Sequence, residues 1–240
     1  MLLRSVLQVV YPPRCIGCGA QVESDFGLCS ACWRDTPFIA GTVCECCGVP
    51  LPGDADGYRI ECDDCMATPR PWVDGRSVML YAGQARSLVL ALKHGDRPEI
   101  AHAVAPWMAR VAAPLLREDM VVIPVPLHWS RLWQRRYNQA ALLGQALANQ
   151  AGLQHCPDAL IRPRRTTPQD GKSPQARFES ISGAIRFNPK QTGTFKDRPV
   201  LLVDDVMTSG ATFAECAQVC RDGGSGDVFV LALARAVRED

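Results

Sequence analysis

Runs of apolar residues alternate with helix-like patterns along most of the chain after residue 76. Short apolar runs predict strands, and these runs cover residues 77–81, 120–126, 184–187, 200–203 and 227–234. Between them, apolar residues recur at helical spacing, which predicts helices at residues 84–93, 99–116, 131–150, 174–181 and 213–220. A polar stretch that contains proline, residues 162–174, predicts a long loop. This alternation predicts an α/β fold with a mainly parallel sheet flanked by helices.

The apolar run at residues 200–203 is followed at once by two adjacent carboxylates, Asp204 and Asp205. Open α/β sheets bind ligands at the carboxyl ends of their strands, where we expect these acids to lie. A turn of small and hydroxyl residues comes next, made of Thr208, Ser209, Gly210, Ala211 and Thr212. Its N–H groups and hydroxyls open onto a helix N-terminus and suit a phosphate. Acids followed by a phosphate loop fit a ribose 5-phosphate, whereas a strand, turn and helix without a ligand would not need this combination.

The N-terminal part of the chain is rich in cysteine. Nine of the twelve cysteines lie between residues 15 and 65, and eight of these form four C-x-x-C pairs. Two such pairs complete a tetrahedral four-sulfur zinc site, so four pairs predict two structural zinc sites. In sequential order the first site takes Cys15, Cys18, Cys29 and Cys32, and the second takes Cys44, Cys47, Cys62 and Cys65. A cross-braced pairing also fits the spacing, and Cys46 competes with its neighbours as a ligand.

Disulfides or metal-free thiols are the alternative for this segment, but no secretory feature accompanies it. Residues 1–10 form a mainly apolar segment, but it is short and includes Arg4 and Gln8. It therefore predicts a short amphipathic helix and not a signal peptide. No apolar run is long enough to span a bilayer, and we therefore expect a cytoplasmic protein without a membrane span. Lys and Arg number 26 against 25 Asp and Glu, a net charge of +1, which argues against a polybasic arm for nucleic acid.

The residue types change near residues 67–71, where two prolines follow the last cysteine pair. We therefore expect two units, residues 1–68 with the N-terminal helix and the zinc sites, and residues 69–240 with the α/β domain. The first unit has few large apolar residues, so its folding is expected to depend on the metal.

Residues 200–212 resemble the phosphoribosyl pyrophosphate signature of type I phosphoribosyltransferases and match it at every position. Further matching segments are residues 92–96, 122–127, Arg131, 135–139, Arg164, Gln169 and Arg177. With the four cysteine pairs, they make the chain similar to the ComF competence-protein family, which joins a double zinc ribbon to a type I phosphoribosyltransferase-like domain. The Arg-Gly-Phe-Asn-Gln segment usual in that family is Arg135-Arg136-Tyr137-Asn138-Gln139 here, and Ser180 stands in place of an asparagine.

The resemblance implies phosphoribosyl pyrophosphate as a ligand, bound together with Mg²⁺. Lys93, His94 and Gly95 match the loop that meets the pyrophosphate, although these residue types also suit an ordinary helix end. Asp204 and Asp205 would orient the ribose hydroxyls. Arg135 and Arg136 would form a hood over the ligand or a contact for single-stranded DNA, with a solvated basic face as the alternative.

The resemblance also implies a role in processing incoming single-stranded DNA during natural transformation, with competence helicases or recombination proteins as partners. As an enzyme, the protein would be a glycosyltransferase, specifically a pentosyltransferase, and the sequence does not define its acceptor. Alternatively, it is a non-catalytic single-stranded DNA-binding or scaffold protein that keeps the site for sensing its ligand. Salvage of a free purine or pyrimidine is a third interpretation, which the zinc ribbon does not favour.

Overall fold

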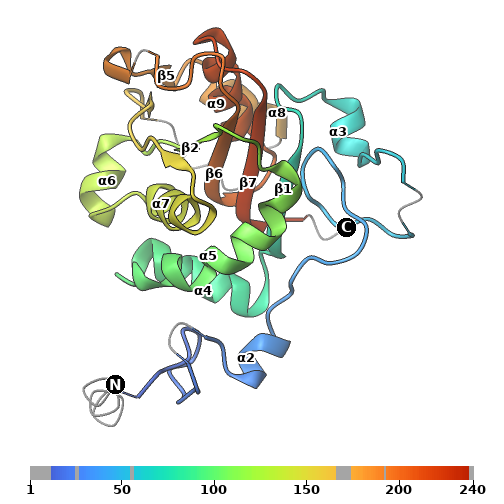
Figure 1. Cartoon of the computed structure of the whole chain (residues 1–240), viewed down its shortest axis with the longest axis vertical. Coiled ribbons are helices and arrows are strands. Elements are labelled where there is room, and N and C mark those ends of the chain that lie inside the picture. The colour runs from blue at the N-terminus through green and yellow to red at the C-terminus, as the bar shows by residue number, and fades with distance from the viewer. Residues whose placement is uncertain (1–11, 25–26, 55–56, 166–173, 192, 238–240) are drawn as a thin grey trace.

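The computed structural model describes most of the chain, namely residues 12–24, 27–54, 57–165, 174–191 and 193–237. Its core is a sheet in the order β1-β7-β6-β2-β3, in which every neighbouring pair of strands is parallel (Figure 1). The strands are β1 (Gly75–Leu80), β2 (Val121–Pro124), β3 (Gln154–His155), β6 (Val200–Met207) and β7 (Val228–Arg235). The helix predicted for residues 1–10, and Gln169, lie outside the described residues.

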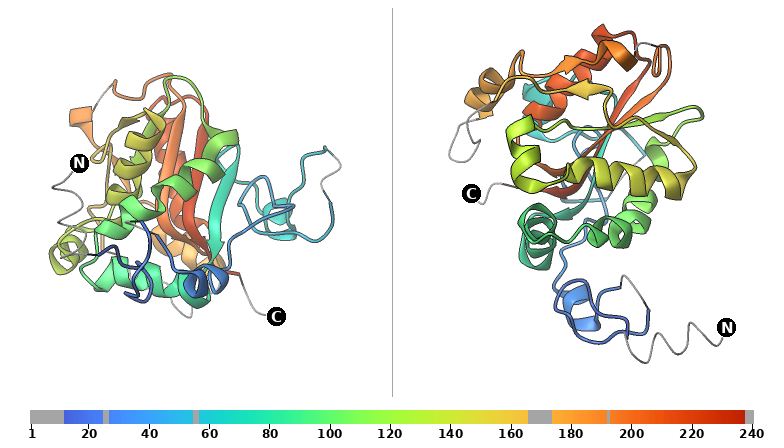
Figure 2. Two further views of the ribbon diagram at one scale, coloured as in Figure 1. Left: turned by 60° about the horizontal axis from the view of Figure 1, so that its bottom comes forward. Right: turned by 90° about the vertical axis from the view of Figure 1, so that its left-hand side faces the viewer.

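Helices cover both faces of this sheet (Figures 1 and 2). The helices of this domain are α4 (Gly83–His94), α5 (Glu99–Ala112), α6 (Trp129–Arg135), α7 (Gln139–Ala151), α8 (Pro174–Ile181) and α9 (Ala211–Asp222), with short 3₁₀ helices η1 (Ala113–Leu115) and η2 (Pro189–Gln191). Leu201 of β6 packs with α4, α5 and α7, whereas its neighbour Leu202 packs with α9 on the other face. Because both faces are covered, the central strands are apolar almost throughout.

The predicted fold class is confirmed, and most predicted elements lie where the pattern placed them. The strand predicted at 184–187 is shorter, because only Arg186–Phe187 (β5) forms a strand. It pairs antiparallel with β4 (Leu160–Ile161) and lies outside the main sheet. The strand that begins at Val200 is longer than predicted and carries both acids within it before ending at Met207.

The single helix predicted at residues 131–150 is wrong, because the structure has α6 and α7 in its place. Arg136 ends α6 with a left-handed backbone, at φ 68°. Asn138 begins α7, and its side chain accepts a hydrogen bond from the N–H of Ala140 at 3.1 Å. The Tyr137 hydroxyl donates to the carbonyl oxygen of Leu92 at 2.8 Å, which turns this residue out of a continuous helix. No glycine or proline marks the break, so helical spacing alone could not reveal it.

The two cysteine-rich segments lie at different places on the α/β domain (Figures 1 and 2). The first, with α2 (Ser30–Arg34), lies below α4 and α5, and the second, with α3 (Asp63–Ala67), lies beside β1. Between them, Phe38 forms a bridge with Met79 and so joins the edge strand of the sheet. Among the residues that the structure describes, no helix has the length and apolar character needed to cross a membrane.

Candidate functional site

The strand β6 ends in a short loop that opens onto the N-terminus of α9. Gly210 stands directly before α9 with φ 79°, a backbone conformation that glycine adopts without strain. The N–H of Ala211 donates to the hydroxyl of Ser209 at 3.4 Å. A small hollow over this loop is lined by Arg177, Asp204, Val206 and residues 207–213. The predicted residues Thr208 to Thr212 therefore lie together at a helix N-terminus, where backbone N–H groups favour an anion.

The two adjacent acids of β6 lie in different environments. Asp205 is buried, and its Oδ1 lies 3.1 Å from Nζ of Lys93 in the last turn of α4. Asp204 is only partly buried, lines the hollow, and accepts a hydrogen bond from the N–H of Asp205 at 2.8 Å. Desolvation and the charge of Asp205 raise the pKa of Asp204 to about 7, against the opposing charges of Lys93 and Arg162. The structure thus brings together both acids and Lys93, which are far apart in the sequence.

The end of α4 carries the residues predicted to meet pyrophosphate. Gly95 caps the helix, its N–H donating to the carbonyl oxygen of Ala91 at 2.8 Å. A Cβ at this position would lie 2.7 Å from the same oxygen, so the helix end itself requires glycine. His94 is exposed, and desolvation followed by the charges of Arg135 and Lys93 lowers its pKa. Gly95 is therefore explained as a helix cap, while the role of this loop towards pyrophosphate stays a prediction.

Residues 135–139 connect the end of α4 to the end of β2. Besides the bond from Tyr137 to Leu92, the side-chain amide of Asn138 donates to the carbonyl oxygen of Val125 at 3.0 Å. Arg135 Nη1 donates to Oε1 of the buried Gln139 at 3.2 Å and lies near His94. Arg136 forms an ion pair with Asp96 and remains largely exposed. The structure brings Arg135 to the site but places Arg136 at its outer edge, and Tyr137 and Asn138 hold the segment.

The eight paired cysteines form two compact clusters, grouped sequentially and not cross-braced. Within each cluster the sulfur atoms all lie within 4.8 Å of one another, and Cys46 belongs to neither. The Sγ atoms of Cys18 and Cys29, like those of Cys47 and Cys62, are 3.7 Å apart. A tetrahedral site with Zn–S bonds of about 2.3 Å has sulfur–sulfur edges of about 3.8 Å. All twelve cysteines are described, and none forms a disulfide.

Backbone N–H groups point at the sulfur atoms of both clusters. Cys29 N–H donates to Cys15 Sγ at 3.2 Å, and Cys62 N–H donates to Cys44 Sγ at 3.3 Å. Such donors stabilise thiolates, the form that binds zinc. Both clusters therefore fit structural zinc, and their four protein ligands leave no position for catalysis.

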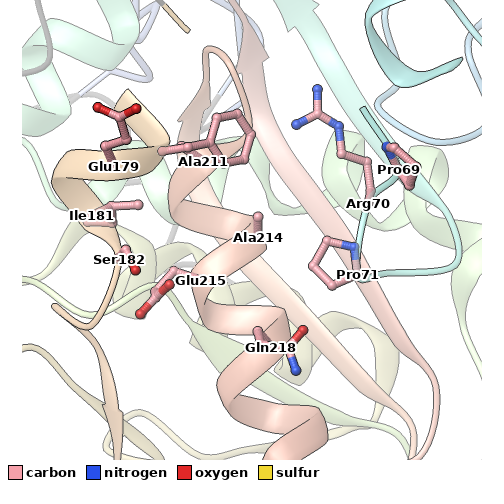
Figure 3. A pocket seen from close by; sticks show the side chains of 11 residues that line it. Pro69, Arg70, Pro71, Glu179, Ile181, Ser182, Ala211, Ala214, Glu215 and Gln218 are labelled. Carbon is pink, nitrogen blue, oxygen red and sulfur yellow. The ribbon is translucent and has the colours of Figure 1, made fainter. Parts of the chain in front are cut away.

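A larger groove, of about 570 Å³, lies between α8, α9 and residues 69–71 (Figure 3). Glu179 and Glu215 line it, and their charges oppose the binding of a phosphate. Arg70, at its upper rim, donates to the carbonyl oxygen of Ser209 at 3.1 Å. We therefore place the candidate phosphate site in the smaller hollow, with this groove behind its loop.

Three residues contact residues 208–212, the phosphate loop, but the sequence patterns did not single them out. These are Arg70, Trp72 and Arg235, and each of them also lies near the second cysteine cluster or the segment that follows it. Arg235 was detectable in principle, because it is the one charged residue of an otherwise apolar buried strand. The other two lie in a loop without periodicity.

A family model for the double zinc ribbon domain matches residues 6–66. DNA utilization protein YhgH of Shigella flexneri is 34% identical over 218 residues, which cover 88% of this chain and 92% of that protein. Competence protein F of Haemophilus influenzae is 28% identical over 229 residues, which cover 93% of this chain and 97% of that protein. Among solved structures, a glutamine phosphoribosylpyrophosphate amidotransferase from B. subtilis aligns with a TM-score of 0.41 and 16% identity, over 60% of this chain and 30% of that chain.

Two four-cysteine clusters, matched by the double zinc ribbon model and followed by a parallel sheet with helices on both faces, define a double zinc ribbon joined to an α/β domain. The similarity to the relatives extends over nearly the full length of both chains. The chain belongs to the ComF family of competence proteins.

Proposed function

We propose that the protein binds phosphoribosyl pyrophosphate with Mg²⁺ at the carboxyl end of β6 and acts in the processing of incoming single-stranded DNA. The observation that carries this proposal is the grouping of Asp204, Asp205 and Lys93 beside the loop of residues 208–212. The names of the relatives, which refer to DNA utilization and to competence, support the role in DNA processing.

The ligand would lie across the end of the strand, with its phosphate on α9. The N–H groups of residues 208–212 would hold the 5-phosphate, where the dipole of α9 favours negative charge. Asp204 and Asp205 would accept hydrogen bonds from the 2- and 3-hydroxyls of the ribose. Lys93 neutralises Asp205 and would attract the pyrophosphate with its remaining donors.

The donor set of this site fits Mg²⁺, which prefers hard oxygen ligands and retains several of its waters. Asp204 and Asp205 would hold the ion through one of these waters. When bound, the ion neutralises the charge that develops on the leaving pyrophosphate.

In a transfer reaction, an acceptor forms a bond to ribose C1 while the bond from C1 to pyrophosphate breaks. The ring gains oxocarbenium character on the way, as in glycoside chemistry. The two adjacent carboxylates would stabilise this positive charge electrostatically and fix the ring through its hydroxyls. The phosphate loop would anchor the sugar, so that C1 stays in place as the bonds change.

Isothermal titration with phosphoribosyl pyrophosphate and Mg²⁺ tests the binding site. The double substitution Asp204→Asn/Asp205→Asn should abolish binding, whereas Asp227→Asn, on the exposed residue before β7, should leave the affinity unchanged. Unchanged affinity in the double variant would show that the site is wrongly placed. A screen for pyrophosphate release with bases, amines and DNA ends as acceptors then tests catalysis.

Binding of single-stranded DNA without catalysis is a second candidate function, and α6 favours it. Trp129 and Trp133 on this helix are 64% and 79% exposed, and no residue of α6 is buried. Exposed aromatic rings beside basic side chains suit the stacking of unpaired bases. Retained ligand binding with no pyrophosphate release from any acceptor would favour this function over the enzyme.

A further inference from the structure

Arg235 is a buried charged residue at the end of β7. It is 6% exposed, and the other seven residues of the strand are apolar and buried. In the part of the chain that the structure describes, no carboxylate forms an ion pair with it. A guanidinium cannot lose its charge, and a buried charge needs compensation. The partners of Arg235 therefore require an explanation.

One side of the guanidinium holds the start of the phosphate loop. Nη1 of Arg235 donates to the carbonyl oxygens of Met207, at 3.2 Å, and of Thr208. It also donates to the carbonyl oxygen of Ala236 at 2.7 Å. These carbonyl oxygens accept from Arg235, which is not among the residues that line the hollow. A carbonyl oxygen directed into the hollow would instead repel a phosphate. Arg235 thus favours the loop conformation in which N–H groups face the anion.

The other side of the guanidinium faces the second cysteine cluster. Nη2 of Arg235 lies 3.8 Å from Sγ of Cys47, a residue 188 positions away in the chain. Zinc held by four thiolates has a net charge of about −2, and this charge is the compensation that Arg235 lacks elsewhere. The thiolate of Cys47 is largely buried, so the attraction between the two groups is only weakly screened.

Trp72 forms a second connection between the same two places. Its Nε1 donates to the carbonyl oxygen of Cys46 at 2.6 Å, inside the turn that carries Cys47. The same ring lies against the phosphate loop, since a Cβ on Gly210 would come within 3.2 Å of it. Arg70, 5.7 Å from the Trp72 ring, donates to Ser209 of that loop.

We infer that Arg235 is a positioning residue that couples the second cysteine cluster to the phosphate loop. It balances the charge of the zinc-thiolate group with one side and orders the carbonyl oxygens of Met207 and Thr208 with the other. Zinc binding at this cluster then favours the anion-binding form of the loop, and an anion in the loop favours retention of zinc, because such coupling is reciprocal. This inference rests on the proposed function, in which residues 208–212 hold the 5-phosphate.

The first cysteine cluster contacts a different part of the domain. There Arg97 Nη1 donates to the carbonyl oxygen of Ile16, between Cys15 and Cys18, at 3.2 Å. Arg97 also forms an ion pair with Glu99, at the start of α5. The substitution Arg97→Met therefore serves as a matched control, since it removes an arginine from the other cluster.

Two measurements on the full chain test the inference. Isothermal titration with ribose 5-phosphate reports the phosphate loop, and release of zinc to a chromophoric chelator reports both clusters. Arg235→Met should lower the affinity of one of the two clusters for zinc by about 10–100-fold. It should also lower the affinity for ribose 5-phosphate by about 10-fold. Arg235→Lys keeps the charge but not the fork of donors, so it should retain zinc and still lose ribose 5-phosphate affinity. In the wild type, ribose 5-phosphate should slow the release of one zinc ion.

Arg97→Met should leave the affinity for ribose 5-phosphate unchanged. If the Arg235 variants do not fold, Trp72→Phe removes the bond to Cys46 and shortens the ring that lies against Gly210, and it should shift both measurements in the same direction. Wild-type values for zinc and ribose 5-phosphate in Arg235→Met, or in Trp72→Phe as its substitute, would overturn the inference. If the wild type itself binds no ribose 5-phosphate, the proposed function fails. Zinc release from Arg235→Met then decides separately whether Arg235 compensates the cluster.

Discussion

Nζ of Lys93 lies 3.1 Å from Oδ1 of Asp205, and this ion pair joins the last turn of α4 to the end of β6. Both side chains are mostly buried, so the pair is less screened than one at the surface. Without Lys93, the carboxylate of Asp205 would remain charged and buried beside Asp204. The pair therefore places a positive charge beside the two adjacent acids of the candidate site.

Replacement of Lys93 by methionine should destabilise the protein and weaken ligand binding. We expect a loss of about 3 kcal/mol in the free energy of unfolding, because one largely buried charge loses its partner. Urea unfolding measures this loss, and Lys190→Met, at an exposed lysine of η2, is the control. The double variant Lys93→Met/Asp205→Asn should lose less stability than the sum of the two single variants. Strict additivity would contradict the importance of the pair.

Replacement of Asp204 by asparagine should stabilise the ligand-free protein at high pH. The pKa of Asp204 is raised from 3.8 to about 7 in the folded protein. The unfolded chain therefore releases this proton at a lower pH than the folded protein does, and stability falls as pH rises from about 4 to about 7. The variant lacks this penalty, so its advantage should be largest above pH 7, at up to about 4 kcal/mol for a shift of about three pKa units.

Urea unfolding of wild type and Asp204→Asn at pH 5 and pH 8, without Mg²⁺, checks this prediction. The difference in unfolding free energy should be clearly greater at pH 8 than at pH 5. The same variant should lose phosphoribosyl pyrophosphate binding, which would mark Asp204 as kept for function and not for stability. An equal difference at both pH values would show that Asp204 titrates normally.

The exposed tryptophans of α6 should contribute to single-stranded DNA binding. The double variant Trp129→Ala/Trp133→Ala should lose about 10-fold or more in affinity for a labelled oligonucleotide, because each stacked base contributes about 1–3 kcal/mol. Fluorescence anisotropy at several salt concentrations measures the affinity. Tyr58→Ala removes another exposed aromatic ring, 82% accessible, in the second cysteine segment. If both variants bind as the wild type does, α6 is not the contact.

The two cysteine clusters should release zinc at different rates. Cys44, Cys47 and Cys65 are buried and belong to the core on one face of the sheet, whereas Cys18 of the first cluster is exposed. A chelator should therefore remove zinc in two phases, with the first cluster emptied first. Only the second phase should lower the melting temperature of the α/β domain strongly. A single phase would contradict this difference.

Short-range patterns predicted most of the elements. The buried strands β6 and β7 follow from their continuous apolar runs, and the loop after β6 follows from its glycine and hydroxyl residues. The division of residues 131–150 into two helices could not be predicted, because Tyr137 and Asn138 leave the helix for partners at Leu92 and Val125. Those partners come near only after the domain folds.

The sequence by itself determined which groups are present: four cysteine pairs, two adjacent acids and a phosphate-type loop. Each of these depends on spacing within a few residues, which the local backbone preserves. The tertiary structure alone decided that Lys93 neutralises Asp205 and that Arg235 lies between Cys47 and the phosphate loop. Such contacts depend on the order of strands in the sheet, because β7 pairs with both β1 and β6 and so places Arg235 beside the end of β6.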